Sequence, residues 1–418
     1  MTRTDVIVLG AGIIGTSVAL QLVKRGFAVA LVDKRGPGEG TSYGNAGIIE
    51  GDTLFPRPFP SDAATLLRVA TRLAPEANYH LTFLPRIAPW LLAYRAWSSP
   101  QRLIETAKLM RPLFAQALAE HEALMAESGA DRYLRKTGWL KLYRSGDTFG
   151  ETKRERRVAD DFGLAYRVLD TDGARALEPA LAPVFRHAVL WEDSASLSNP
   201  LAVTQAYAQR FVQLGGRLVK GDAMTLRRSA LACRVETSEG GIEAGHAVIA
   251  LGPWTNDLLR GVRLRLPLAV KRGYHRHYRP RGDASLARPV FDAEGGYVLA
   301  PMEQGIRLTT GAEFADRDAA PTPVQFGRIM PSAKQLFPLG AAVEAKPWMG
   351  SRPCLPDSRP VIGQAPGHPW LWIAAGHAHW GLTLGPVTGR LVAEMMSGAT
   401  PFCDPAPYRA ERFGPLRV

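Results

Sequence analysis

Residues 6–33, VIVLGAGIIGTSVALQLVKRGFAVALVD, constrain the fold of this chain more than any other segment. An apolar run enters Gly10-x-Gly12-x-x-Gly15, a helical pattern follows, and a second apolar run ends on Asp33. This order of strand, tight turn, helix, strand and acid is typical of the βαβ unit that binds an adenine dinucleotide. The glycines allow the turn, the approach of a pyrophosphate and close helix packing, while the helix N-terminus offers free N–H groups to phosphates. The Asp33 carboxylate is placed to hold ribose hydroxyls.

The apolar content of 46% indicates a globular protein. A chain of 418 residues is longer than a single hydrophobic core usually accommodates, so we expect two domains. The formal net charge of +12 indicates a solvated basic surface, or else attraction to anionic substrates, anionic lipid or nucleic acid. No nucleic-acid-binding motif is present, so we expect no nucleic-acid partner. Cys233, Cys354 and Cys403 have no paired spacing, which favours a reducing compartment and predicts neither a disulfide framework nor a metal site.

Two apolar segments bear on the location of the protein. Residues 6–23 carry no charge, but their glycine spacing is already explained by nucleotide binding, so we expect a cytoplasmic protein without a transmembrane helix. The segment from Phe83 to Trp97 is unusually apolar and aromatic. We expect it to be a helix packed into the second domain; the alternative is an amphipathic surface that contacts a partner or the inner face of the cell membrane.

The order of helical and strand patterns predicts two interleaved domains in an α/β fold. Asn199 and Pro200 predict a helix over 201–214, residues 262–314 alternate like antiparallel strands, and a further helix is expected to start at Pro386. A Rossmann-type nucleotide-binding domain is therefore split over 1–55, 195–258 and 346–418. The inserted α+β domain, built on an antiparallel sheet, comprises 56–194 and 259–345.

Four motifs together resemble the FAD-dependent D-amino-acid oxidase superfamily over residues 5 to 398. They are VIVLGAGIIG with its acid, the loop TSYGNAG, KRGY, and the pair WMGSRPCLPDSRPVIG plus AAGHAHWGLTLGPVTG. Within the superfamily the chain is most similar to bacterial D-amino-acid dehydrogenases, including the hydroxy-D-proline dehydrogenase branch.

The resemblance implies a flavoprotein with non-covalent FAD. Covalent relatives carry a cysteine near the GxRP segment, but it matches a position closer to Gly350 than to Cys354. The loop GHAHWG departs from the family pattern by His379 and Trp380, which leaves the flavin contacts there approximate. The implied cofactor-binding residues are Gly10, Gly12, Ile13, Ile14, Gly15, Asp33, Lys34, Thr41, Ser42, Asn45, Ala46, Gly47, Gly252, Gly350, Gly376, His377, Gly381, Leu382 and Thr383.

Three residues are the candidates for catalysis. Oxidation of an amine to an imine moves a hydride from Cα to flavin N5, so the protein must orient the substrate and stabilise charge on the flavin. By the resemblance Arg352 binds the substrate carboxylate, which suits its planar fork; a structural pairing with Asp357 is the alternative. Tyr274 either hydrogen-bonds that carboxylate or packs in the sheet. His377 either faces the flavin or is a satisfied polar group.

A basic stretch follows residue 262. Its alternation favours a solvated strand face, and the second interpretation is a positive field that attracts a substrate carboxylate or an anionic bilayer. The residues are Arg263, Arg265, Lys271, Arg272, Arg276, Arg279 and Arg281.

The resulting hypothesis is an enzyme of amino-acid catabolism. It deaminates D-amino acids oxidatively, including D-proline or hydroxy-D-proline types, to imino or 2-oxo acids and passes electrons to a quinone or carrier. The alternatives are an oxidase of glycine- or sarcosine-oxidase type that reduces oxygen, and a flavin subunit of a larger dehydrogenase complex. The general base, the substrate side chain and the oligomeric state are left open.

Overall fold

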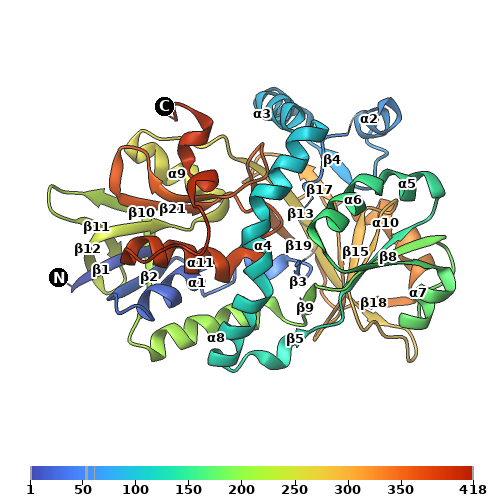
Figure 1. The fold of residues 1–418 in the computed structure, drawn as a ribbon, viewed down its shortest axis with the longest axis horizontal. Helices are drawn as coiled ribbons and strands as arrows, with labels where there is room; N and C mark the ends of the chain where they lie inside the picture. Colours follow the sequence, from blue (N-terminus) through green and yellow to red (C-terminus); the bar gives the residue numbers. More distant parts are fainter. Residues whose placement is uncertain (1, 52–54, 61, 417–418) are drawn as a thin grey trace.

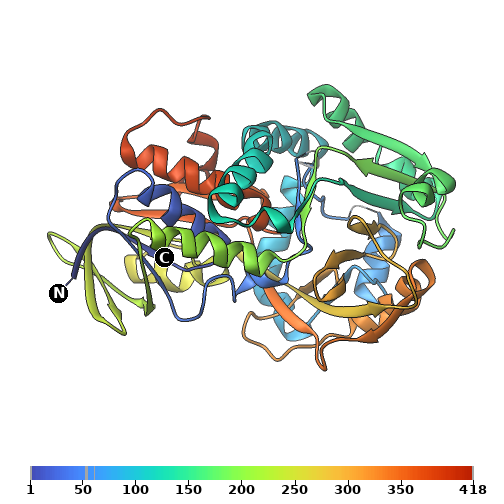
Figure 2. The same cartoon turned by 90° about the horizontal axis from the view of Figure 1, so that it is seen from below.

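The computed structural model describes residues 2–51, 55–60 and 62–416. Two large sheets lie side by side along the long axis of the molecule, and the long helix α4 (Pro100–Ser128) crosses the region between them (Figures 1 and 2). A small third sheet joins three short strands, in the order β3 (Ile48–Ile49), β9 (Ala195–Leu197) and β5 (Leu134–Arg135).

The first large sheet carries the nucleotide-binding pattern. Its central strands pair in parallel, β1 with both β2 and β12, and β12 with β21, and side chains from Val6 to Leu9 are fully buried, as expected for a sheet covered on both faces. The helices α1 (Ile13–Val23), α8 (Pro200–Gln213) and α11 (Gly381–Ser397) pack together beside it. The strands are β1 (Thr2–Leu9), β2 (Val29–Asp33), β10 (Arg217–Arg228), β11 (Cys233–Thr237), β12 (Gly240–Ile249), β20 (Val361–Ala365) and β21 (His368–Ala375).

The second large sheet is mostly antiparallel, and β13 is its most connected strand because it pairs with β16, β17, β18 and β19. Its strands are β4 (Ala77–Tyr79), β6 (Trp139–Tyr143), β7 (Tyr166–Asp170), β8 (His187–Trp191), β13 (Ala269–Pro280), β14 (Val290–Asp292), β15 (Tyr297–Met302), β16 (Gly305–Thr309), β17 (Ala312–Phe314), β18 (Leu339–Ala342) and β19 (Trp348–Cys354). The remaining helices are α2 (Ala63–Ala70), α3 (Leu84–Trp97), α5 (Gly146–Glu151), α6 (Lys153–Phe162), α7 (Thr171–Leu177), α9 (Thr255–Leu259) and α10 (Gln325–Leu336).

The predicted α/β fold class is confirmed, and so is the helix after Asn199, whose side chain caps α8 by accepting the Ala202 N–H at 3.0 Å. The domain boundaries stay a prediction, and their outer segments include residues 1, 52–54 and 417–418, which lie outside the described residues. Strand β19 falls in the segment 346–418 assigned to the nucleotide domain, yet it pairs with β13 of the second sheet.

The prediction that the last long helix starts at Pro386 is wrong, because α11 begins at Gly381. A proline inside a helix removes the hydrogen bond to the carbonyl four residues earlier, here that of Leu382. His121 of α4 replaces this bond: its Nε2 lies 2.8 Å from the Leu382 oxygen, while Nδ1 lies 3.1 Å from the Tyr207 hydroxyl. A distant side chain therefore permits the additional turn.

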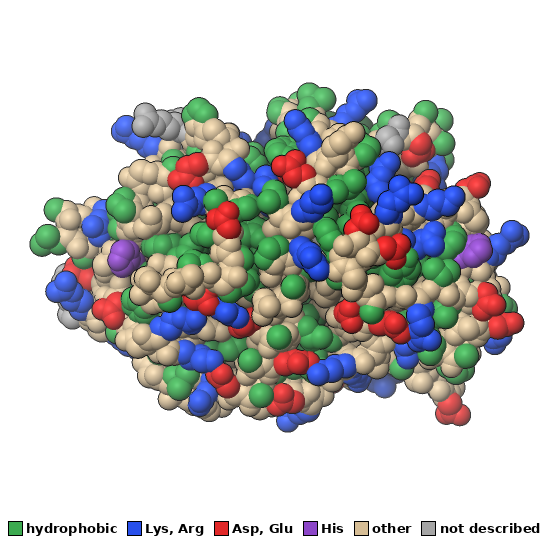
Figure 3. All heavy atoms as spheres, viewed as in Figure 1, with side chains coloured by type: hydrophobic (Ala, Val, Ile, Leu, Met, Phe, Trp, Pro, Cys, Tyr) green, Lys and Arg blue, Asp and Glu red, His purple; other side chains and the backbone are tan. Residues whose placement is uncertain are grey.

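The predicted apolar helix is α3, which packs inward through Ile87, Trp90 and Tyr94. Leu92 of the same helix is 67% exposed, and Leu67 of α2 and the following Leu73 are exposed as well. Hydrophobic side chains are visible along the upper edge of the molecule in Figure 3. Within the described residues, no helix combines the length and the apolarity needed to cross a bilayer.

The positive charge does not gather in one patch on the face shown in Figure 3, where lysine and arginine side chains are spread over both halves and interspersed with acids. The predicted solvated strand face is contradicted at Arg272, which is fully buried. Strand β13 starts only at Ala269, so Arg263 and Arg265 precede it.

Replacement of His121 by Leu is expected to lower the free energy of unfolding by about 1–3 kcal/mol at pH 7, because it leaves a buried carbonyl without a donor. Burial lowers the pKa of His121 to about 4, so the unfolded chain takes up the proton first as the pH falls below about 6.5. Neutral His121 therefore contributes its full stabilisation above about pH 6.5. As the pH falls to 5, the free energy of unfolding decreases by about 2 kcal/mol, because the unfolded chain binds the proton more tightly.

Urea unfolding at pH 7 and pH 5 measures both effects. The difference between wild type and His121→Leu should shrink at pH 5, whereas the exposed control His246→Gln should show no such change. An unchanged difference at the two pH values would contradict the assigned role of His121.

Candidate functional site

A cavity of about 620 Å³ lies where the carboxyl ends of β1, β2, β12 and β21 face strands β13 and β19. The predicted site residues that line it are Gly10, Gly12, Ile13, Ile14, Asp33, Lys34, Thr41, Ser42, Asn45, Gly252, Gly350, Arg352, Gly376, His377, Gly381 and Leu382. The predicted residues that are not part of its lining are Gly15, Ala46, Gly47, Tyr274 and Thr383.

The glycine-rich turn has the shape that a pyrophosphate requires. Gly10 has φ +104°, and a Cβ there would lie 2.5 Å from the Ala250 oxygen. A Cβ on Gly15 would lie 1.8 Å from the Gly10 oxygen, so Gly15 serves helix packing below the cavity rather than its lining. The backbone of Gly12 and the first turn of α1 border the cavity, and this cradle fits a dinucleotide.

Asp33 and Ser42 hold the turn in place. The Asp33 carboxylate accepts the N–H groups of Ala11 at 2.7 Å and Arg35 at 2.9 Å. The Ser42 hydroxyl accepts the Ile13 N–H at 2.9 Å. Both side chains therefore hold the glycine-rich turn in shape while they line the cavity.

The loop from Thr41 to Gly47 is fastened from the second sheet. Inside the loop, Asn45 donates to the Ser42 carbonyl at 2.8 Å and accepts the Gly47 N–H at 2.6 Å. From β16, Arg307 donates through Nη1 to the carbonyls of Tyr43 at 2.9 Å and Asn45 at 2.7 Å. This buried arginine therefore connects the cavity loop to the second sheet.

His277 and Glu344 orient Arg307. The Arg307 Nε donates to His277 Nε2 at 2.9 Å, so this ring nitrogen is the acceptor and Nδ1–H donates to the Glu344 carboxylate. Burial lowers the pKa of Arg307 to about 10, and burial together with the Arg307 charge lowers the pKa of His277. His277 must be neutral here, because its Nε2 can accept the hydrogen bond from Arg307 only when that nitrogen carries no proton.

Arg352 is the cation that β19 presents to the cavity. Its guanidinium rests on Gly273, where a Cβ would lie 2.6 Å from each terminal nitrogen, and Nη1 donates to the Gly311 carbonyl at 3.2 Å. The alternative pairing with Asp357 is not formed, because that carboxylate binds Arg359 and Arg412 instead. Burial, and then the charge of Arg57, lowers the pKa of Arg352.

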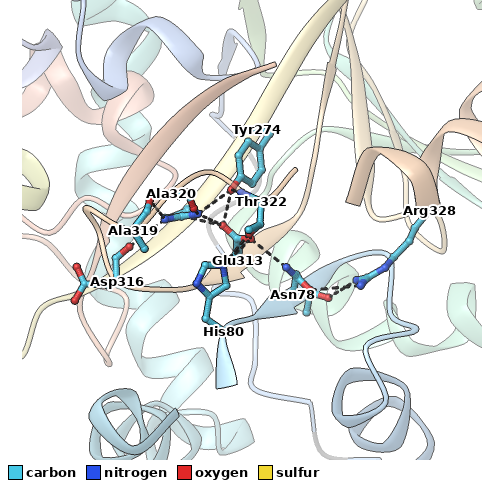
Figure 4. Close-up of polar contacts among 11 residues, drawn as sticks. Asn78, His80, Tyr274, Glu313, Asp316, Ala319, Ala320, Thr322 and Arg328 are labelled. Atoms are coloured by element: carbon cyan, nitrogen blue, oxygen red, sulfur yellow. Dashed lines mark hydrogen bonds and ion pairs between the residues drawn. The ribbon is translucent and has the colours of Figure 1, made fainter. Parts of the chain in front are cut away.

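Tyr274 does not reach the cavity, which corrects its predicted catalytic role. Side chains alternate along β13, so Gly273 faces the cavity and Tyr274 faces the opposite side. There its hydroxyl donates to Glu313 at 2.6 Å and accepts from Arg272 at 3.0 Å and from the Thr322 N–H at 2.8 Å (Figure 4).

Glu313 is the centre of this buried cluster. It binds Arg272 at 2.7 Å and Asn78 at 3.0 Å and also accepts the Thr322 hydroxyl (Figure 4). Burial opposes the Glu313 charge, but the hydrogen bonds from Thr322 and Tyr274 and the charge of Arg272 outweigh it and hold its pKa below the usual value. The cluster is a satisfied structural network.

His377 lines the cavity, but its Nε2 lies 3.0 Å from the Thr388 hydroxyl of α11. Burial lowers the pKa of His377 to about 3, so the ring is neutral. Thr383 accepts the Glu50 N–H at 3.1 Å and donates to the Ile48 carbonyl at 3.3 Å. The N-terminus of α11, at Gly381 and Leu382, borders the cavity beside His377.

The cavity lining also includes Trp348 and His379, neither of which was a predicted site residue. Trp348 places its ring where a Cβ of Gly44 would lie, 1.6 Å from the nearest ring atom, and stacks on His275 at 5.0 Å between centroids. His379 also lines the cavity, and the only signal for it was the departure in GHAHWG. In the described part of the chain, no group of three or more His, Cys, Asp or Glu side chains forms a potential metal site.

Solved structures share this architecture. A glycine oxidase from Geobacillus kaustophilus superposes with a TM-score of 0.76 at 24% identity and covers 99% of both chains. An L-proline dehydrogenase from P. horikoshii superposes with a TM-score of 0.72 at 20% identity over the full length of both chains.

Sequence relatives extend over nearly the whole chain. It is 30% identical to a D-amino-acid oxidase of Bradyrhizobium diazoefficiens, over 98% of both chains. It is 31% identical to a D-amino acid dehydrogenase of Paramagnetospirillum magneticum, over 94% of this chain and 95% of that one. A glycine oxidase of Pseudomonas putida is 27% identical over 97% and 98%. The family model described as FAD dependent oxidoreductase matches residues 5–395, and the protein is therefore a member of the DAO family of FAD-dependent oxidoreductases.

Proposed function

We propose that this protein oxidises D-amino acids with FAD as the electron acceptor and transfers the electrons onward to a quinone or carrier. The observation that carries this proposal is Arg352, a cavity-lining guanidinium that donates a hydrogen bond to the Gly311 carbonyl and forms no ion pair with the residues that the structure describes. Relatives named D-amino-acid oxidase and D-amino acid dehydrogenase support the substrate class. The relatives named glycine oxidase support an oxygen-using amino acid oxidase as the second candidate.

The residues present fit FAD. The turn at Gly10 and Gly12 would accommodate the pyrophosphate and Asp33 would hold the ribose, while Thr41, Ser42 and Asn45 line the same cavity as Arg352. When bound, FAD supplies a two-electron acceptor for the hydride that leaves Cα, while the amine loses a proton and the C–N bond becomes an imine. Cys354 is buried and outside the cavity lining, and burial raises the pKa of its thiol, which favours non-covalent FAD.

The protein groups around Arg352 then act on the substrate. Arg352 holds the carboxylate by a bidentate contact and so fixes Cα. The positive charges of Arg57, Lys271 and Arg352 disfavour an ammonium, which promotes the neutral amine that can release a hydride. The N-terminus of α11 directs its free N–H groups and its dipole toward negative charge that develops at the far edge of the cavity.

An anaerobic titration of the yellow holoenzyme tests the substrate class. D-amino acids should bleach the flavin absorbance, while L-amino acids and glycine should not. Faster recolouring with a quinone than with air would support a dehydrogenase, and equally fast recolouring in air would favour the oxidase. Failure of every D-amino acid to bleach the flavin would refute the proposal.

Replacement of Arg352 by Met should raise KM for D-amino acids at least about 100-fold, because two charge-assisted hydrogen bonds to the carboxylate are lost. Arg352→Lys should fall between this variant and wild type. The visible spectrum should show that both variants retain FAD. The exposed control Arg265→Gln removes one charge elsewhere and should keep the wild-type KM; unchanged KM in Arg352→Met would exclude this residue from the substrate site.

Replacement of Arg307 by Met should weaken FAD binding about ten- to hundred-fold, because the loop from Thr41 to Gly47 loses its two hydrogen bonds from β16. Dilution followed by the fluorescence of released FAD measures the dissociation constant. Arg281→Met, an exposed arginine beyond β13, is the control. Equal FAD retention in the two variants would show that Arg307 does not hold the cofactor loop.

A further inference from the structure

Two cations stand opposite each other across the strands that wall the cavity. In the antiparallel pairing of β13 and β19, Lys271 is directly opposite Arg352, so both side chains lie on the same face of the sheet. Like charges in this arrangement are destabilising when nothing neutralises them. The pairing therefore needs a counter-ion that stabilises it.

The described residues supply no such counter-ion. No ion pair is formed by Lys271, Arg352 or Arg57 within the described ranges, whereas Arg272, the residue next to Lys271, is fully paired with Glu313. Arg57 adds a third positive charge, which acts on both Arg352 and His379. Arg272 is thus neutralised by a carboxylate, whereas Lys271, which lies on the same face of β13 as the cavity-lining Gly273, is not.

Lys271 is surrounded by aromatic rings in place of carboxylates. Its ammonium lies 4.1 Å from the ring centroid of Tyr94, 5.0 Å from that of Trp90 and 5.7 Å from that of Phe314. Such contacts orient a cation without neutralising it. The apolar wall also lowers the local dielectric, which strengthens the attraction between this ammonium and an incoming anion.

The position of Arg57 is fixed by the same aromatic helix. The Tyr94 hydroxyl donates to the Arg57 carbonyl at 2.5 Å, and the guanidinium lies 4.9 Å from the ring centroid of Phe291. Of the three cations Arg352, Lys271 and Arg57, Arg57 is solvent-exposed. One substrate carboxylate neutralises Arg352 and leaves the charges of Lys271 and Arg57 unmatched.

From this geometry we infer that the preferred substrate carries a second carboxylate, and that Lys271, assisted by Arg57, binds it while Arg352 binds the α-carboxylate. The inference rests on the proposed function and narrows it to D-amino acids with an acidic side chain. Lys271 is then a specificity-determining residue.

Isosteric substrate pairs test the inference, because D-glutamate and D-glutamine, or D-aspartate and D-asparagine, differ mainly in charge. With the FAD-loaded enzyme, kcat/KM should be at least about tenfold higher for each acid than for its amide. Lys271→Gln should lower this acid-to-amide ratio about ten- to hundred-fold, and Lys271→Arg should retain most of it. The exposed control Arg279→Gln removes a charge from the same strand and should leave the ratio unchanged.

The outcomes separate the two proposals. A high ratio that collapses in Lys271→Gln and survives in Lys271→Arg supports the second carboxylate site. Oxidation of the amides as efficiently as the acids, or a ratio that Lys271→Gln does not lower, overturns the inference and leaves the proposed function standing. If neither acidic nor neutral D-amino acids reduce the flavin, both proposals are refuted.

Discussion

The antiparallel register between β13 and β19 is the constraint on which the site depends. It places Lys271 opposite Arg352 and Gly273 opposite Gly350, so that a small residue and a cation alternate on the wall of the cavity. The same register turns Arg272 and Tyr274 to the other side, where Glu313 neutralises the arginine. A shift by one residue would exchange these two sets and bury an unpaired cation. The pairing therefore separates the arginine that is neutralised by Glu313 from the arginine that lines the cavity.

Local signals predicted the nucleotide-binding part of the fold well. The turn, helix and acid between Gly10 and Asp33 are contiguous in sequence, and each residue serves a backbone requirement that its type alone reveals. The cap at Asn199 is equally local. The overall α/β class follows from the order of such local patterns and needs no knowledge of side-chain contacts.

Long-range contacts decide what sequence reasoning missed. The start of α11 depends on a hydrogen bond between His121 and Leu382, which are 261 residues apart. Tyr274 was a candidate because it lies in a motif, but the face on which it lies follows from the pairing of β13. The charge of Lys271 opposite Arg352 was equally hidden in a basic stretch, because the sequence does not show which cations form an ion pair with a carboxylate.

The contacts of Arg307 have a consequence for the order in which the protein matures. The loop that borders the cavity is complete early in synthesis, but its anchor is at residue 307, and the carboxylate that orients this anchor is at residue 344. Strand β21 of the nucleotide sheet lies later still. In the nascent chain the glycine-rich dinucleotide motif is therefore synthesised long before the residues that complete the cofactor site. The cavity that fits FAD is therefore assembled only when the polypeptide is nearly complete, because its lining extends to Leu382.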